Sequence, residues 1–386
     1  MPVLQKQKKK QKRGAFRILL ILIYIAVIVY IVVALMSGSA PGFAQLTGMF
    51  SNRASAVRAG EYNFSVGRDR VFADLGGSLA AAGTLGVQVL DHSGSETLRD
   101  SFRMSSPAIV SAGRRAIAFD ISGTEVRVFD GAGVTAAFQA DGTIISASIN
   151  QNGWFAVVTQ PGGGYRGLVT VYNDRGVNVF EVFTFERGFA VTAALSPDNR
   201  RLALLSLTED GSRVWFFNLD SPDPVGDFLL PGGVIIDIAF LSGGNVLAVS
   251  TRSLLVIGVN GRGTEFFEFD GRHLRGHCFD GDFIALHLLD RTVGYSGRIV
   301  TLNEQGRVFG EMDTGREVIS MSTGGGYLAV LWSDGVLFYD RELDEFLPYG
   351  DGAAHAGADA RRVLALDGGA ALVAGDFSAV VLNIDG

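Results

Sequence analysis

The sequence predicts an all-β protein, most simply an eight-bladed β-propeller, preceded by one transmembrane helix. Three observations support this class. A short apolar strand that ends at a turn-forming residue recurs along the chain, its copies are about 40 residues apart, and no segment beyond Tyr62 has helical periodicity of useful length. The first long apolar run, residues 16–36, is of the length that a membrane-spanning helix needs.

The repeated strand reads apolar, any residue, two apolar residues and then a turn former. An apolar, β-branched run that stops at Asp, Asn or Gly is typical of a strand entering a hairpin. The spacings between the first seven endpoints are 39, 43, 45, 40, 45 and 37 residues, which is the period of a four-stranded propeller blade. The eight copies end at Asp91, Asp130, Asn173, Asn218, Gly258, Asn303, Asp340 and Ile384.

The order of strands within each repeat is also regular. A first strand is followed by a turn, a strand of small apolar residues, the repeated strand and a more polar outer strand, and Ser196-Pro197-Asp198-Asn199 is a tight turn of the kind that joins the first two. Outer strands are expected at 179–185 and 265–269. First strands are expected at 71–74, 144–149, 191–195, 234–240 and 318–322.

The two ends of the predicted propeller complement each other. The last repeat stops at its third strand, 380–384, whereas residues 61–66 precede the first repeat and have no partner there. We expect residues 61–66 to supply the missing outer strand of the last blade, because ring closure hides sheet edges that would otherwise template aggregation. Seven blades plus an irregular unit is the alternative, and a pair of β-sandwiches does not account for so regular a repeat.

Charge is segregated along the chain. Lys6, Lys8, Lys9, Lys10 and Lys12 are the only lysines, and with Arg13 and Arg17 they all lie within the first 17 residues. Without those seven, the 33 basic residues reduce to 26 arginines against 40 acidic residues, a net charge near −14. So acidic a body repels phosphate backbones and argues against nucleic-acid binding. The single cysteine, Cys278, cannot form an internal disulfide and is read as a small buried residue.

The N-terminal region divides into three parts. Residues 1–15 form a basic tail, residues 16–36 an apolar run with Arg17 as its only charge, and residues 37–60 a small, polar tether. Basic residues before an apolar span favour a cytoplasmic N-terminus, which would place residues 61–386 outside. We expect an uncleaved single-pass anchor in the cell membrane. Cleavage near residues 42–44, or a helix buried in a soluble core, are the alternatives.

This layout resembles a family of uncharacterised membrane-anchored, propeller-like proteins of Gram-positive anaerobes, a domain of unknown function. The resemblance rests on the basic tail, the single apolar span, the tether and the S-P-D-N-R-R-L-A turn at 196–203, without a diagnostic motif. It implies a propeller at the cell envelope and no known activity.

No motif predicts a catalytic residue, cofactor or metal site. Residues 162–167 fit G-x-G-x-x-G, but strands flank them and a hairpin loop is expected. His273, His277 and Cys278 resemble zinc ligands, yet in a strand residues four apart lie about 13 Å from each other. Two acidic loops have oxygen ligands of the kind that calcium prefers, but they lack EF-hand spacing, and Asp and Asn are also ordinary turn residues, so turns are expected there. These loops are Asn218/Asp220/Asp223 and Asp280/Asp282; His92, His287 and His355 stand alone and are read as structural or solvated.

The outer strands place phenylalanine beside glutamate, in V-F-E-V-F-T-F-E (179–186) and T-E-F-F-E-F-D (264–270). Alternation predicts aromatic residues in the core and acids outside, with an exposed aromatic ridge as the alternative. Taken together, a rigid ring with many loops and no catalytic motif favours a non-enzymatic protein-binding or scaffolding module at the envelope. A glycan hydrolase or lyase, or a ligand-sensing propeller, are the alternatives, and fold alone does not choose among them.

Overall fold

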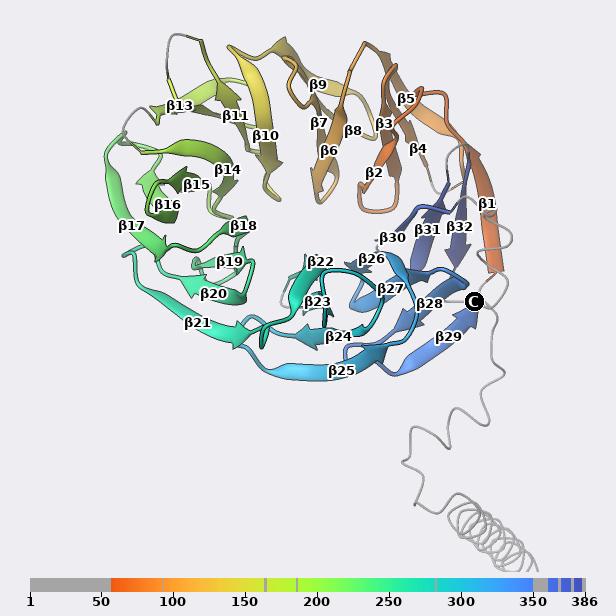
Figure 1. Ribbon diagram of the computed structural model, residues 1–386. Coiled ribbons are helices and arrows are strands. Elements are labelled where there is room, and N and C mark those ends of the chain that lie inside the picture. The colour runs from red at the N-terminus through yellow and green to blue at the C-terminus, as the bar shows by residue number, and fades with distance from the viewer. Residues whose placement is uncertain are drawn as a thin grey trace, which may run out of the picture. The chain divides into compact units, whose positions relative to one another are not determined.

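The computed structural model describes residues 57–383 except for residues 92, 163–164, 185–186, 282, 350–359, 367–368 and 376–377. The described chain forms eight four-stranded antiparallel sheets arranged as blades around a centre (Figure 1). In blades 1 to 7 the four strands follow one another in sequence, so each blade is a meander whose first strand is innermost. The predicted eight-bladed all-β propeller is therefore confirmed.

The first four blades span residues 71–231. Blade 1 contains β2 (Val71–Asp74), β3 (Leu79–Gly83), β4 (Gly86–Leu90) and β5 (Glu96–Ser101). Blade 2 contains β6 (Pro107–Ala112), β7 (Arg115–Asp120), β8 (Glu125–Asp130) and β9 (Val134–Gln139). Blade 3 contains β10 (Thr143–Ile149), β11 (Phe155–Gln160), β12 (Leu168–Tyr172) and β13 (Asn178–Phe183). Blade 4 contains β14 (Phe189–Leu195), β15 (Arg201–Thr208), β16 (Gly211–Asn218) and β17 (Pro224–Pro231).

The other four blades complete the ring. Blade 5 contains β18 (Ile235–Phe240), β19 (Val246–Ser250), β20 (Ser253–Ile257) and β21 (Gly263–Glu268). Blade 6 contains β22 (His273–Asp280), β23 (Phe283–Leu289), β24 (Gly297–Leu302) and β25 (Val308–Thr314). Blade 7 contains β26 (Val318–Gly324), β27 (Tyr327–Trp332), β28 (Gly335–Tyr339) and β29 (Glu345–Tyr349). Blade 8 contains β30 (Arg362–Leu366), β31 (Ala370–Ala374), β32 (Ser378–Asn383) and β1 (Val57–Asn63).

Blade 8 is built from both ends of the described chain. Strand β1 pairs antiparallel with β32, with Tyr62 opposite Ala379, and supplies the outer strand of that sheet. The closing strand covers residues 57–63 instead of the expected 61–66. The boundary differs because Val66 leaves blade 8, and its carbonyl accepts a hydrogen bond from Leu85 N at 2.8 Å in blade 1. Phe64 and Val66 are still buried, at the boundary between the two blades.

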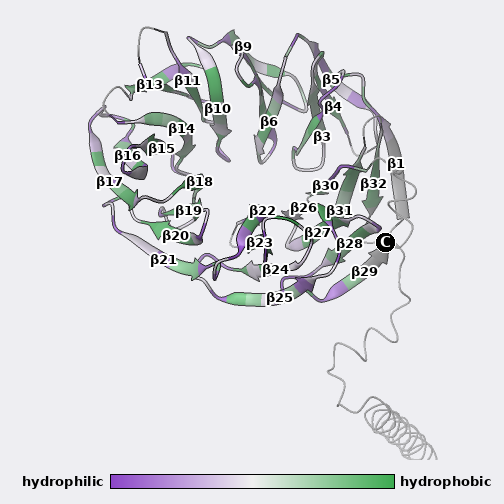
Figure 2. Ribbon diagram, in the orientation of Figure 1, coloured by the Kyte–Doolittle hydropathy of each residue, from purple (hydrophilic) through white to green (hydrophobic). Residues whose placement is uncertain are grey.

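The hydrophobic core is divided among the blade interfaces. The described core forms eight clusters, and each contains residues from two neighbouring blades. Side chains alternate between the two faces of each second strand, so one strand can pack against both neighbouring blades. In β7, Ala116 and Ala118 pack toward blade 1, whereas Ile117 and Phe119 pack toward blade 3. Figure 2 shows hydrophobic residues in strands all around the ring. Each blade thus depends on both neighbours for its buried faces.

Backbone irregularities recur at equivalent places. In blades 3 to 7 the first strand is bulged near its start, and in blades 1 to 7 the pairing of third and fourth strands shifts register. Gly86 shows why glycine begins several third strands, since its φ is +130° and an added Cβ would lie 2.1 Å from Asp100 O. Bulges increase local twist and redirect side chains. They therefore change which residues of the innermost strands reach solvent.

The predicted membrane helix, residues 16–36, the tail 1–15 and most of the tether 37–60 lie outside the described residues. Within the part of the chain that the structure describes, no helix has the length and hydropathy that crossing a membrane requires.

Candidate functional site

Antiparallel meanders divide the loops of a blade between two ends. The turns from first to second and third to fourth strand lie at one end of the ring. The turns from second to third strand and the links to the next blade lie at the other, which we call the link face. The described residues form hollows, exposed apolar groups and charged clusters on both faces. Three features stand out.

The first feature is a basic pocket at the inner edges of blades 7, 8 and 1 on the link face. Two adjoining hollows of about 480 and 390 Å³ share Phe72, Arg361, Arg362 and Ala374 in their walls. Arg68 and Arg70, from the link that enters β2, line the smaller hollow, whereas residues 319–322 of β26 line the larger one. We define the basic pocket by Arg68, Arg70, Phe72, Arg361 and Arg362.

The walls of the basic pocket are held by hydrogen bonds between blades. Ser320 Oγ accepts from Val363 N at 3.3 Å, and Ser322 Oγ accepts from Ala365 N at 3.0 Å, which joins β26 to β30. On the opposite side Phe72 packs against Phe64, with ring centroids 5.0 Å apart. The hollow is thus formed by well-connected innermost strands.

The second feature is an apolar–arginine patch on the link face of blades 3 and 4, defined by Tyr165, Arg166, Phe183, Phe189 and Leu207. The four apolar side chains are 43, 44, 52 and 44 % exposed, in that order. The rings of Tyr165 and Phe183 are 5.0 Å apart, the Arg166 guanidinium lies 5.3 Å from the Phe189 ring centre, and Phe189 pairs with Leu207 across the sheet. The patch is therefore continuous across two blades.

The patch resolves the two interpretations of the outer-strand phenylalanines. Phe180 is buried between blades 3 and 4 and Phe269 is fully buried, as core packing requires. Phe183 instead faces outward on the same side of β13 as Glu181. Both interpretations hold in part, because three-residue spacing along a strand sends two phenylalanines to opposite faces.

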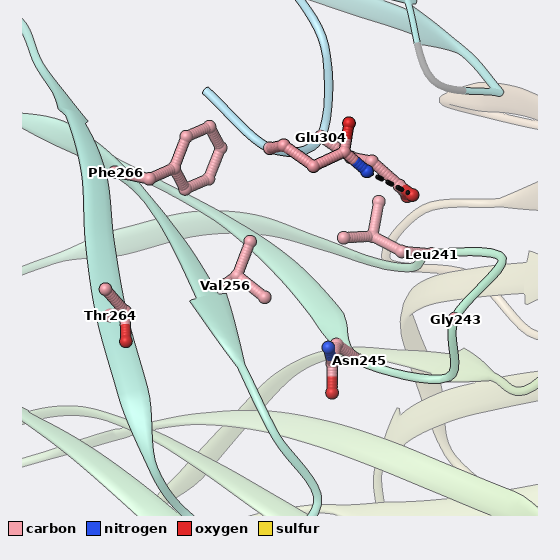
Figure 3. A pocket seen from close by; sticks show the side chains of 8 residues that line it. Leu241, Gly243, Asn245, Val256, Thr264, Phe266 and Glu304 are labelled. Atoms are coloured by element: carbon pink, nitrogen blue, oxygen red, sulfur yellow. Dashed lines mark hydrogen bonds between the residues drawn. The ribbon is translucent and has the colours of Figure 1, made fainter. Parts of the chain in front are cut away.

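The third feature is a small apolar cleft between blades 5 and 6 at the other end of the ring, of about 290 Å³. Figure 3 shows Leu241, Val256 and Phe266 of blade 5 around a common space, with Glu304 reaching in from a loop of blade 6. Phe266 is half-buried here because β21 shifts register against β20 between Leu254 and Leu255. The cleft is smaller than a typical ligand pocket.

The histidine–cysteine motif separates in space. A bulge between Leu274 and Gly276 interrupts β22, and His277 Nε2 lies 2.9 Å from Asp237 Oδ2 on β18 of blade 5. Cys278 packs between blades 6 and 7, where burial raises its thiol pKa to about 12, so the thiol stays protonated at neutral pH. Among the described residues no group of three or more His, Cys, Asp or Glu side chains is placed to hold a metal ion.

The remaining sequence motifs occupy turns. Residues 162–167 connect β11 to β12 as a hairpin loop, as expected, although 163–164 lie outside the described residues. Asn218 and Asp220 share a hollow with Arg200 and Arg201, whose positive charge disfavours a cation. Ser196–Asn199 joins β14 to β15, and Asn150 of blade 3 donates to Ser196 O at 2.9 Å. His92, His355 and Asp282 lie outside the described part.

Sequence reasoning missed the residues of the basic pocket. The signal was present as Arg68-Asp69-Arg70 immediately before the predicted first strand 71–74, and as Arg361-Arg362 at the start of β30, for which no strand was predicted. Because links to first strands all lie on one face, such arginines approach one another whenever their blades are neighbours. Blades 8 and 1 are neighbours through closure of the ring.

The fold and its meander blades define the class of protein, an eight-bladed β-propeller. The C-terminal WD40 domain of Sif2 is similar over 86 % of this chain and 99 % of its own, with a TM-score of 0.59 and 15 % identity. BamB from Moraxella catarrhalis is similar over 85 % of this chain and 99 % of its own, with a TM-score of 0.52 and 15 % identity. Identity this low shows the fold alone.

The chain belongs to the family of unknown function DUF5711, which it matches over residues 56–342. The match begins next to the first residue of the closing strand β1 and ends between β28 and β29, the third and fourth strands of blade 7. No curated protein matches the sequence.

Proposed function

We propose that this protein is a non-enzymatic protein-binding module, anchored in the cell membrane by residues 16–36 and carrying its propeller outside. The observation that supports binding is the apolar–arginine patch. Aromatic residues and arginine are enriched at the centres of protein interfaces, where they supply large contact area and several hydrogen-bond donors. Exposed apolar groups that are contiguous, instead of scattered singly, mark interaction surfaces.

The structure around the patch favours binding without large rearrangement. Gly167 approaches the next blade so closely that an added Cβ would lie 2.6 Å from the Ala190 methyl group. Trp215 Nε1 donates to Ser206 Oγ at 3.0 Å, and the Arg187 guanidinium lies 5.9 Å from the Trp215 ring. The close approach of Gly167 packs blade 3 against blade 4, and the Trp215 contacts hold β15, β16 and the link at Arg187 together beneath the exposed groups. A rigid surface loses little conformational entropy when a partner binds.

The patch can be tested by a paired substitution in the full-length protein expressed in its own cells. Phe183→Ser together with Phe189→Ser removes two exposed rings, and proximity labelling is expected to lose at least one reproducible envelope protein about tenfold or more. The matched control is Val134→Ser with Val308→Ser, two side chains that are 37 % exposed on other outer strands. An identical labelling profile for wild type, patch variant and control would contradict binding through this surface.

The anchor makes a separate prediction about location. Residues 16–36 contain about twenty apolar residues, which at 1.5 Å per residue span a bilayer core of about 30 Å. The full chain is expected in the membrane fraction, with the propeller cleaved by protease added to cells whose wall has been removed. Deletion of residues 16–36 is expected to release it from the membrane. Protection of the wild-type propeller from external protease would overturn the proposed orientation.

Charge in the membrane-flanking region supports the orientation. Seven Lys and Arg residues precede or begin the apolar run, and positively charged flanks remain on the cytoplasmic side. The acidic, lysine-free propeller has no comparable basic flank. The family match carries no activity with it, so this proposal rests on the chain's own residues.

A further inference from the structure

We propose that the basic pocket binds a small organic anion that carries two or more phosphate or carboxylate groups. This inference is independent of the protein-binding patch, which lies on other blades. Four features support it: the charge of the pocket, the absence of a described carboxylate beside Arg68 and Arg362, the size of the pocket and the charge of the surrounding body.

The basic pocket concentrates positive charge. Four arginines line its two hollows, and Asp69 is the only acidic side chain among their described lining residues. The chain beyond residue 17 has far more acidic than basic residues. A positive concavity within an acidic surface focuses the electrostatic potential and attracts anions to one place.

Two of these arginines differ from others in the ring. Arg272 contacts Asp290 at 3.2 Å, Arg298 contacts Glu311 at 2.6 Å and Arg316 contacts Asp334 at 2.6 Å. In contrast, no carboxylate among the described residues lies within ion-pair distance of Arg68 or Arg362. Both are exposed, so their donors are available to a ligand. Guanidinium groups match phosphate and carboxylate with two parallel hydrogen bonds.

The geometry of the pocket limits the class of ligand. Hollows of about 390 and 480 Å³ lie in the range of small-molecule sites. Arg70 is oriented by donating Nε to Gly67 O at 2.8 Å, so its other donors have a fixed direction. Phe72 and Leu364 add apolar wall, which suits the carbon skeleton of an organic anion. A long polyanion would have to cross the acidic surface outside, and this favours a short ligand.

The test uses the full-length protein in a non-ionic detergent, with pyrophosphate and citrate as probes in isothermal titration calorimetry. Saturable binding of at least one probe is expected, and the stronger probe distinguishes phosphate from carboxylate ligands. Arg68→Gln and Arg362→Gln are each expected to weaken binding about tenfold, and the double variant about a hundredfold. Arg362→Lys keeps the charge but loses the planar fork, so a smaller loss is expected.

The matched control is Arg175→Gln, which removes an exposed arginine from the turn between β12 and β13 at the opposite face. It is expected to change the dissociation constant less than twofold. Circular dichroism on each variant verifies the fold. Absence of saturable binding of both probes to the wild type, or equal weakening by Arg175→Gln, would overturn the assignment. Unaltered binding in the folded double variant would do the same.

Discussion

Replacement of Tyr62 by alanine is expected to lower the free energy of unfolding by about 3–5 kcal/mol. The Tyr62 ring is 3 % exposed and lies in the cluster that joins blade 8 to blade 1, with Phe64, Leu372 and Val381. Its backbone belongs to β1, the strand that closes the ring. Truncation therefore leaves a cavity at the one interface where the two ends of the chain meet.

Denaturant unfolding followed by tryptophan fluorescence measures this effect. Trp154 and Trp215 lie near or in blades 3 and 4, away from Tyr62, whereas Trp332 lies in blade 7, next to blade 8. A shift of the whole transition shows that closure stabilises all blades together. Tyr62→Phe keeps the ring and is expected to cost about 1 kcal/mol.

Tyr295→Ala is the control for the closing strand. Tyr295 is 53 % exposed, and its backbone carbonyl, which accepts a hydrogen bond from Thr314 Oγ1, is kept. Loss of the Tyr295 ring is expected to change the free energy of unfolding by no more than about 0.5 kcal/mol. If Tyr62→Ala behaves like this control, β1 does not contribute to the stability of the ring.

A destabilised variant is also expected to aggregate, since an open β32 edge can pair with other chains.

Stability is expected to fall as the pH decreases from 7 to 4, in part because of His287. Burial, and then the charge of Arg275, lower the pKa of His287 from 6.5 to about 4. The unfolded chain takes up a proton below about pH 6.5, whereas the folded protein keeps the imidazole neutral until about pH 4. Its contribution is therefore complete at neutral pH and decreases through this window, by roughly 2–3 kcal/mol.

His287→Leu isolates this contribution. His287 is 4 % exposed, and its Nε2 makes no hydrogen bond within the described part of the chain. Leucine removes the titrating group and the unpaired buried nitrogen, so the variant is expected to be more stable than wild type at pH 5. His273→Leu, an exposed histidine in the adjacent β22, is the matched control and is expected to keep the wild-type pH dependence. Equal pH dependence of wild type and His287→Leu would contradict the assignment.

The repeat could be predicted because its determinants are local. An apolar strand that ends at Asp or Asn, followed by a turn, depends on residues within a few positions of each other. Strand β2 has its predicted bounds, and β10 and β14 begin only one or two residues earlier than expected. The closing strand covers residues 57–63 and not the expected 61–66, because Phe64 and Val66 continue the apolar pattern of β1 but pack beside blade 1.

The candidate sites depend on contacts that are distant in sequence. His277 contacts Asp237, which lies forty positions earlier in the sequence. The spacing of residues within β22 indicates only how far His277 lies from His273. A bulge or register shift changes the exposure of neighbouring residues, as at Phe266, and no residue type announces it. These irregularities arise from twist and packing between blades.

By itself, the sequence determined the strand order within a blade, the repeat that favours eight blades over seven, the need for a strand from the other end of the chain and the segregation of charge. Only the tertiary structure decided that Arg68 and Arg362, almost three hundred residues apart, line one pocket, and that Phe183 and Phe189 share one exposed surface. The physical reason is that hydrophobic periodicity acts along the chain, whereas a site forms where ring closure and blade packing bring distant loops together.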